Sequence, residues 1–311
     1  PITFQQFMLA VVSASDALMV GVIGQDLLSA VSLASQVTFV YNLFLAAMTI
    51  GTSIFAAQYW GKGDRDSIER ILAIVLRTSM AVSLVFFLGA VFFPQMLMKI
   101  FTPEQALIEY GVEYLRIAGV TYLLCGVSQI YLCIMKNSNL AGKSMTISST
   151  AAFLNIVLNA VFIYGLLGMP RMEAAGAAMA TALSRVIELL WVLAELAKKD
   201  RIKIRFCYIF HPDKALRKDF WHYTLPVLGN ELVWGGGFTM YSVIMGHLGS
   251  DAVAANSIAN IVKNLITSLA HGIGNGGSIL VGNELGAGNL ETAKQYGSRL
   301  CGIAVKSGLC S

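Results

Sequence analysis

Two acidic residues lie inside long apolar stretches of this sequence, where a carboxylate is unusual. Asp16 interrupts an otherwise uncharged run at positions 2–22, and Glu231 follows Pro226 by five positions. A charged side chain at bilayer depth costs at least about 2.5–3.5 kcal/mol, so such residues usually have a function. Neither acid has a Lys or Arg within one helical turn. We therefore expect each carboxylate to bind a proton, a metal ion such as Na⁺, or a cationic substrate.

Both acids also have a structural interpretation. Asp16 lies about five residues from the end of its apolar run, so water at the membrane interface could hydrate it. Pro226 removes a backbone donor and should kink or open the helix near Glu231, whose carboxylate could then interact with a helix N-terminus.

Several amide, hydroxyl and aromatic side chains could join these acids. Asn155 and Asn159 are four residues apart and share a helix face, where they could ligate an ion or hydrogen-bond to another helix. Thr181, from the following helix, could complete that cluster. Other residues could line a cleft between helices: Gln36, Tyr41, Trp234 and Asn256.

The composition indicates that membrane-crossing helices position these residues. Apolar residues make up 56% of the 311-residue chain and charged residues 13%, with a mean hydropathy of +0.66. A soluble domain carries about 25% charged residues. The stretches 71–93 and 146–168 are long enough to cross a bilayer, which takes about 20 residues. The net charge of +4 comes from basic residues in loops, so we expect no nucleic-acid binding. The five cysteines show no metal-ligand spacing.

Turn residues divide the chain into nine expected helices. Pro94 ends the third, and Thr102-Pro103-Glu104 begins the fourth with a capping residue and a proline. The segment 198–219 is charged and should be a loop or an amphipathic helix. The expected ranges are 2–22, 29–60, 66–93, 102–135, 142–168, 173–198, 218–247, 251–282 and 290 to the end.

The chain contains one stretch twice. Residues 1–64 align with residues 226–289 without a gap, and thirteen of the 64 pairs are identical, six of them Gly or Pro. Those six fix backbone shape rather than hydrophobicity, so a shared apolar composition does not explain the match. A long repeat in an apolar chain is typical of a two-lobed transporter. Six helices separate the copies, so both cross the membrane in the same direction.

Basic residues indicate the orientation. Lys and Arg concentrate in the loops after the second, fourth, sixth and eighth helices. The positive-inside rule places these loops (2–3, 4–5, 6–7 and 8–9) in the cytoplasm of a multi-pass protein of the inner (plasma) membrane. Arg116 and Arg185 lie within helices and are interpreted as snorkelling or structural.

Several motifs, in this order, resemble multidrug and toxic compound extrusion (MATE) transporters. They are 16–24 (DALMVGVIG), 58–64 (QYWGKGD), 155–159 (NIVLN) with 176–181 (GAAMAT), 225–226 (LP) and 281–288 (VGNELGAG). The resemblance covers essentially the whole chain. It implies an all-α polytopic membrane protein with two pseudo-symmetric six-helix lobes. It also implies a secondary antiporter that exports organic cations, drugs or toxic metabolites in exchange for Na⁺ or H⁺.

On this basis, residues 1–200 form the complete first lobe, residues 201–217 a cytoplasmic linker, and residues 218–311 about three helices of the second lobe. Both ends of the chain look truncated. The resemblance implies that Asp16 takes part in ion coupling or substrate release. A glutamate is frequent in the seventh helix of the family, in some branches one turn further along, where Trp234 stands here. One branch has an Asp at the position of Asn159.

The expected partners are cationic, amphipathic small molecules and membrane lipid, with a coupling ion in place of a cofactor and a monomeric state. The two lobes should rock about a central cleft, with Asp16 and Glu231 facing the space between them. A flippase for lipid-linked precursors, of the same superfamily, is one alternative, although it should show more cleft arginines. An intramembrane enzyme is another, but the sequence contains neither HExxH nor GxSxG, so we expect no catalysis.

Overall fold

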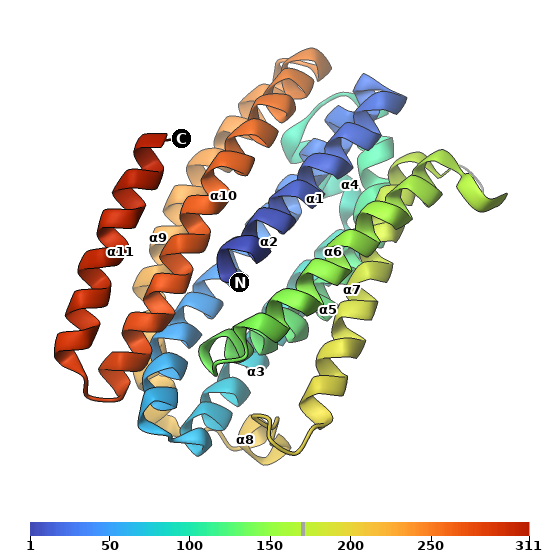
Figure 1. Ribbon diagram of the computed structural model, residues 1–311. Helices are drawn as coiled ribbons and strands as arrows, with labels where there is room; N and C mark the ends of the chain where they lie inside the picture. Colours follow the sequence, from blue (N-terminus) through green and yellow to red (C-terminus); the bar gives the residue numbers. More distant parts are fainter. Residues whose placement is uncertain (169–171, 311) are drawn as a thin grey trace.

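The protein is a bundle of long helices (Figure 1). The computed structural model describes residues 1–168 and 172–310, and this part of the chain contains no strand. The elements are α1 (Ile2–Ile23), α2 (Gln25–Lys62), α3 (Arg65–Phe92), α4 (Pro94–Phe101), α5 (Gln105–Asn137), α6 (Ala141–Tyr164), the 3₁₀ turn η1 (Leu166–Gly168), α7 (Glu173–Ala197), α8 (Phe206–Phe210), α9 (Lys214–His247), α10 (Ser250–Gly286) and α11 (Leu290–Cys310).

Six of the described helices are long and apolar enough to cross a membrane: α1, α2, α3, α5, α6 and α7. The helices α9, α10 and α11 have sufficient length, with 34, 37 and 21 residues, but contain more polar residues. The nine long helices expected from the sequence are all present. The all-α polytopic fold class is therefore confirmed.

Local sequence determines where α2 ends and α3 begins. Gly63 adopts the left-handed conformation, with φ of 76°, and its backbone N–H closes the last turn of α2. Glycine reaches this conformation without the steric penalty of a Cβ atom. The Asp64 carboxylate then caps α3 by accepting hydrogen bonds from the N–H of Ser67 at 3.1 Å and from its hydroxyl at 2.6 Å. Gly288, which aligns with Gly63, makes the same turn after α10, with φ of 84°.

The largest hydrophobic core lies between α2, α3 and α5 and includes Tyr41 and Tyr122. Their ring centroids are 4.7 Å apart. The Tyr41 hydroxyl lies 2.8 Å from Ser83 Oγ and donates to the carbonyl oxygen of Tyr122 at 2.7 Å. Only 1% of Tyr41 is exposed. The prediction that Tyr41 lines a cleft is therefore wrong, because its hydroxyl finds both partners inside the bundle.

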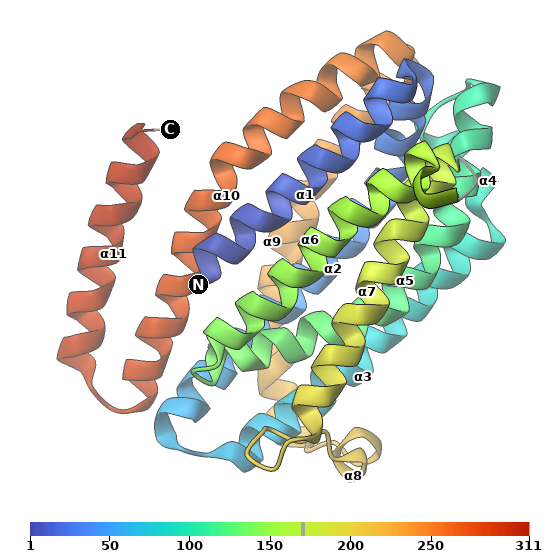
Figure 2. The ribbon, with the colours of Figure 1, turned by 45° about the vertical axis from the view of Figure 1, so that its right-hand side comes forward.

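The second copy of the repeat packs directly on the first. Helix α10 lies along α1 and α2, and α9 packs against α2 (Figures 1 and 2). Ser32 and Ser257 are equivalent by the 225-residue offset, and their hydroxyl oxygens are 2.6 Å apart. Near them, Gln25 donates to Asp251, and the Ser29 hydroxyl donates to the carbonyl of Ser250 at 2.9 Å.

The other ends of α2 and α10 also meet at equivalent positions. A Cβ atom on Gly61 would lie 2.2 Å from the backbone oxygen of Asn283, and one on Gly286 would lie 2.1 Å from that of Gln58. Gly61 aligns with Gly286, and Gln58 with Asn283. The two contacts are thus related by the pseudo-twofold axis of the repeat. Helices can approach this closely only where both lack a side chain.

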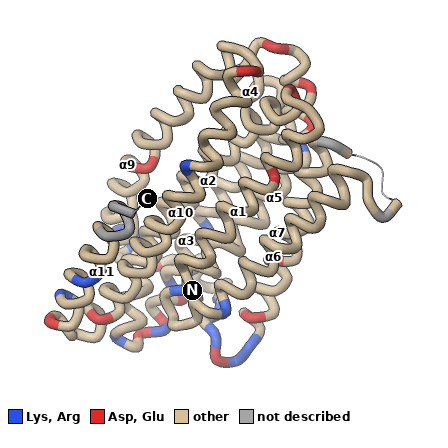
Figure 3. Tube along the Cα trace, turned by 45° about the horizontal axis from the view of Figure 1, so that its top comes forward, with Lys and Arg blue, Asp and Glu red and all other residues tan. Residues whose placement is uncertain are grey.

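The two ends of the bundle differ in charge. Lys and Arg gather at the end that carries the α2–α3, α5–α6 and α10–α11 turns and α8, which we call the basic end (Figure 3). The opposite end carries acidic residues, among them Asp26, Glu104 and Asp251, and we call it the acidic end. Among the described contacts, α11 packs only on α10.

Of two short helices, α4 was not predicted, whereas α8 lies in the segment 198–219 that was expected to be a loop or an amphipathic helix. Pro94 ends α3 as expected, but it then occupies the first turn of α4, which packs against α5 and α9. The segment between α7 and α9 contains α8, which packs on α3. Arg205 pairs with Glu69 at 2.5 Å, and the Tyr208 hydroxyl donates to Asp66 at 2.7 Å. These contacts hold the segment 198–213 against α3.

Candidate functional site

Asp16 lies where α1, α6 and α7 meet. It is half-buried, and its hydrogen-bond partners come from α6. Two positions of α6 four residues apart, Asn155 and Asn159, face it because they share one side of that helix. Asn159 is fully buried, and 3% of Asn155 is exposed. The sequence predicted this pair of amides, and the structure places it beside the carboxylate.

The amides form a short network around the carboxylate. Asn159 donates its Nδ2 hydrogen to Asp16 Oδ1. In the amide orientation that suits its neighbours, Asn155 donates to the same oxygen at 3.1 Å and accepts from the backbone N–H of Thr181 at 3.2 Å. The Thr181 hydroxyl lies 3.3 Å from the same amide. Of the five residues predicted to bind a cation or substrate, the structure thus brings four together: Asp16, Asn155, Asn159 and Thr181.

This cluster can accept a cation. Within the described residues, no Lys or Arg makes a hydrogen bond or ion pair with Asp16, and the buried Asn159 Oδ1 has no hydrogen-bond partner. A carboxylate, an amide oxygen and a hydroxyl are oxygen donors of the kind that hard cations prefer. The same carboxylate could instead bind a proton, because its amide neighbours donate hydrogen bonds without supplying a positive charge.

A charged pair follows the cluster along α7. Arg185, one turn beyond Thr181, pairs with Glu188 at 2.5 Å. Gln129 of α5 donates to the other oxygen of Glu188 at 2.8 Å. The side chain of Glu188 is 1% exposed. Of the two interpretations of Arg185, snorkelling and structural, the structure supports the structural one, because the guanidinium pairs with a buried carboxylate whose role the sequence did not indicate.

Glu231 lies on a different interface. It is half-buried and makes no hydrogen bond or ion pair with the described residues. Thr224, seven residues earlier, faces Gly51, and Gly235, four residues later, faces Leu43. These spacings put Glu231 on the side of α9 that packs on α2. Pro226 lies inside α9, which continues through it from Lys214 to His247.

Trp234 belongs to a separate group of side chains. Trp234 is 52% exposed, and its ring centroid is 6.3 Å from that of Phe39 and 4.7 Å from that of Phe238. The Lys263 ammonium lies 4.6 Å from the centre of the Phe238 ring. These side chains form an exposed aromatic patch between α2, α9 and α10. Gln36 and Asn256 are both half-buried.

Asp16 and Glu231 thus lie at different helix interfaces. Asp16 points into the first lobe towards α6, whereas Glu231 lies between α9 and α2. Asp16 is seven residues from the acidic end of α1, and Glu231 is sixteen residues from that end of α9. At 1.5 Å per residue these are depths of about 10 and 24 Å along the helices. The α6 amides hold Asp16 on its side of α1. That both acids face one central cleft stays a prediction.

Comparison with known proteins decides the family. The model of the MatE family matches residues 1–161 and 226–309. The chain belongs to the MatE family. The resemblance to MATE transporters that the motifs indicated is thereby confirmed, and the two matched segments include both copies of the repeat.

Curated MatE relatives are distant and longer. A probable multidrug resistance protein NorM of Thermotoga maritima is 26% identical over 270 residues, which are 85% of this chain and 57% of that protein. The uncharacterized transporter YisQ of Bacillus subtilis is 22% identical over 90% of this chain and 61% of its own length. The chain thus spans about three fifths of the length of these relatives.

Solved MATE structures share the fold. An outward-facing multidrug resistance MATE family transporter of the MOP superfamily superposes with a TM-score of 0.84 at 22% identity, over all of this chain and 68% of that one. The MATE multidrug transporter DinF-BH, in a ligand complex, gives a TM-score of 0.85 at 18% identity, over 98% of this chain and 68% of that one. At such identities the likeness establishes the architecture of the helices.

Proposed function

We propose that this chain is the larger part of a secondary antiporter that exports cationic, amphipathic small molecules in exchange for Na⁺ or H⁺. The observation that carries the proposal is the Asp16 carboxylate, held by Asn155 and Asn159 without a basic hydrogen-bond partner. Such an acid requires a cation or a proton to balance its charge. The relatives described as multidrug resistance proteins, and the ligand complex of the multidrug transporter DinF-BH, support export of small molecules.

In this mechanism, Asp16 binds the coupling cation and Asn159 supplies its free amide oxygen. The exposed patch of Trp234, Phe39 and Phe238 supports binding of the apolar, aromatic part of a substrate. Glu231 supplies a second negative charge, about two helical turns from Phe238, for a cationic group. Binding of the coupling cation and of substrate in different conformations of the protein then produces exchange.

The flippase alternative has less support from the site. A lipid-linked phosphate needs unpaired arginines in the cleft. Arg185, next to the Asp16 cluster, is paired with Glu188 at 2.5 Å. We also propose that the basic end faces the cytoplasm of the inner membrane, since cytoplasmic loops carry the excess of Lys and Arg.

The test is transport by the full-length protein in proteoliposomes. Efflux of a fluorescent organic cation is measured with an imposed Na⁺ gradient, and separately with an imposed pH gradient. We expect one gradient to drive efflux and Asp16→Asn to abolish it, because the amide keeps the shape of the side chain and removes its charge. Glu231→Gln should also lose cation export.

Glu113→Gln is the matched control, because Glu113 is an exposed acid on α5 outside both sites. It should transport like the unmodified protein. If Asp16→Asn pumps at the unmodified rate under both gradients, Asp16 is structural and the proposed mechanism is wrong.

A further inference from the structure

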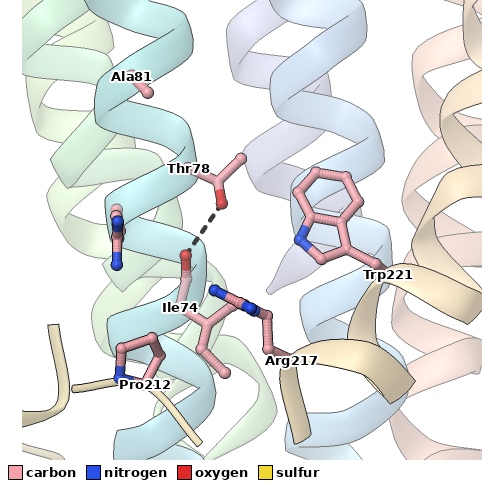
Figure 4. A pocket seen from close by; sticks show the side chains of 7 residues that line it. Ile74, Thr78, Ala81, Pro212, Arg217 and Trp221 are labelled. Atoms are coloured by element: carbon pink, nitrogen blue, oxygen red, sulfur yellow. Dashed lines mark hydrogen bonds between the residues drawn. The ribbon is translucent and has the colours of Figure 1, made fainter. Parts of the chain in front are cut away.

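A cavity of about 270 Å³ lies between α3 and the start of α9, outside the sites described above. Arg217 reaches from α9 towards Ile74 of α3, and Trp221 faces Thr78 across the gap (Figure 4). The Thr78 hydroxyl donates a hydrogen bond to the backbone carbonyl oxygen of Ile74 at 3.1 Å. The lining residues are Ile74, Arg77, Thr78, Ala81, Pro212, Arg217 and Trp221.

The two arginines of the cavity have no counter-charge. Arg77 and Arg217 are exposed, and neither makes a hydrogen bond or an ion pair through its side chain within residues 1–168 and 172–310. Arg77 is twelve residues into α3, which is about 18 Å from its start at the basic end. A guanidinium at that depth in a lipid-facing helix is unfavourable unless an anion or the interface accommodates it.

Two arginines of the same region do have carboxylate partners. Arg70 pairs with Asp66 at 2.8 Å and with Asp213 at 3.4 Å. Arg205 pairs with Glu69 at 2.5 Å. The remaining acids of this region, Asp64 and Asp219, line a separate polar hollow of about 380 Å³ together with Asp66 and Asp213. No described carboxylate lines the arginine cavity.

The rest of the cavity suits hydrocarbon. Ile74, Ala81 and Pro212 supply apolar walls, and Trp221 is of the residue type that gathers at membrane interfaces. The adjoining helix α8 exposes two phenylalanines, Phe206 at 72% and Phe210 at 73%. Exposed aromatic residues beside basic residues place this region at the level of the lipid headgroups.

We propose that this cavity binds an anionic phospholipid, with its phosphate between Arg77 and Arg217 and its acyl chains along the apolar surface of α3 and α9. Guanidinium groups form strong, charge-assisted hydrogen bonds to phosphate. Basic pockets between membrane helices recognise anionic headgroups in this way. The lipid bridges α3 of the first lobe and α9, the first helix of the second. Only the assignment to the cytoplasmic leaflet depends on the orientation proposed above.

The test is retention of lipid by the purified protein in detergent, measured by native mass spectrometry after addition of equal amounts of phosphatidylglycerol and phosphatidylcholine. The unmodified protein should retain phosphatidylglycerol preferentially. Arg77→Gln/Arg217→Gln should lower this preference by at least about tenfold, because the loss of a single charge-assisted contact already corresponds to that factor. Arg116→Gln removes an exposed arginine of α5 elsewhere and should leave the preference unchanged.

Two further arms separate a lipid site from a general effect of charge. Ala81→Trp keeps both arginines but fills the cavity, so it should also lose phosphatidylglycerol. Millimolar inorganic phosphate should not displace the bound lipid, because it lacks the acyl chains. Thermal melting in phosphatidylcholine alone verifies that each variant is folded. Three results would each overturn the proposal. They are equal retention of the two lipids by the unmodified protein, an unchanged preference in Arg77→Gln/Arg217→Gln or in Ala81→Trp, and displacement of the lipid by inorganic phosphate.

Discussion

The close contact between α2 and α10 at the basic end predicts that a single added methyl group, at Gly61, lowers the stability of the protein. A Cβ atom on Gly61 would lie 2.2 Å from the backbone oxygen of Asn283, whereas ordinary contact begins at 3.4 Å. Gly61→Ala therefore requires the helices to separate locally by about 1.2 Å, the difference between these distances, because a backbone atom cannot turn away as a side chain can. Overpacking of this kind costs roughly 1–3 kcal/mol.

The measurement is thermal unfolding of the purified protein. Each kcal/mol corresponds to about 2–4 °C for a chain of this order of size. Gly229→Ala, in α9, is the matched control, because a Cβ atom there has no neighbour within 4 Å. It exchanges the same residues inside a helix and should be neutral or stabilising by up to about 1 kcal/mol. Gly61→Ala should melt several degrees below it.

The double variant Gly61→Ala/Gly286→Ala tests the reasoning more strictly. The two methyl groups act on the same crossing, so the separation forced by one also accommodates the other. Their destabilisation should therefore be smaller than the sum of the two single effects. Equal melting temperatures for Gly61→Ala and Gly229→Ala, or full additivity in the double variant, would refute the idea that this contact limits the approach of the helices.

Three further outcomes are expected. Tyr41→Phe should lower stability by about 1–3 kcal/mol, since buried partners of its hydroxyl lose their hydrogen bonds, and transport per folded molecule should be unchanged in the proteoliposome assay. Asp64→Ala should cost about 1 kcal/mol through the lost cap of α3. The hydroxyl and N–H of Ser67 lower the pKa of Asp64 below its ordinary 3.8, so this stabilisation is present above pH 3.8 and disappears as the pH falls through the lowered value; melting curves of the variant and the unmodified protein should converge there. Arg205→Gln removes the ion pair to Glu69 and should speed proteolytic cleavage within 198–213, and an unchanged cleavage rate would show that the other contacts hold this segment alone.

The long helices and their turns could be predicted from the sequence because their signals are local. Apolar length identifies a crossing helix, and the Gly63-Asp64 pair marks the end of α2 and the start of α3 by backbone conformation and capping. The spacing of Asn155 and Asn159 likewise predicts a shared face, because it depends only on helix geometry. Helix α4 was missed, and for the segment that contains α8 the sequence left a loop and an amphipathic helix open. The choice there depends on packing: Tyr208 of α8, for example, donates a hydrogen bond to Asp66 of α3.

The direction in which Asp16 points could not be predicted. Helix α1 is apolar on all sides apart from a few polar residues, so its pattern does not indicate which face meets α6 and which meets α10. Tyr41 shows the same limit, since its hydroxyl could have faced water in a cleft or partners in a core. Its partners, Ser83 and Tyr122, are 42 and 81 residues away in the chain. Contacts over such separations follow from the assembled bundle.

The meeting of equivalent residues at the axis, Ser32 with Ser257 and Gly61 beside Gly286, has a consequence for the origin of the chain. A residue that touches its own counterpart is the signature of an isologous homodimer. A shorter ancestral chain could have paired with a second copy of itself through these contacts, with every mutation acting on both sides at once. Fusion of two such copies would then have allowed them to diverge. The counterpart of Asp16 is Tyr241, and that of Glu231 is Gln6. The symmetric contacts thus persist while each half carries an acid that the other lacks.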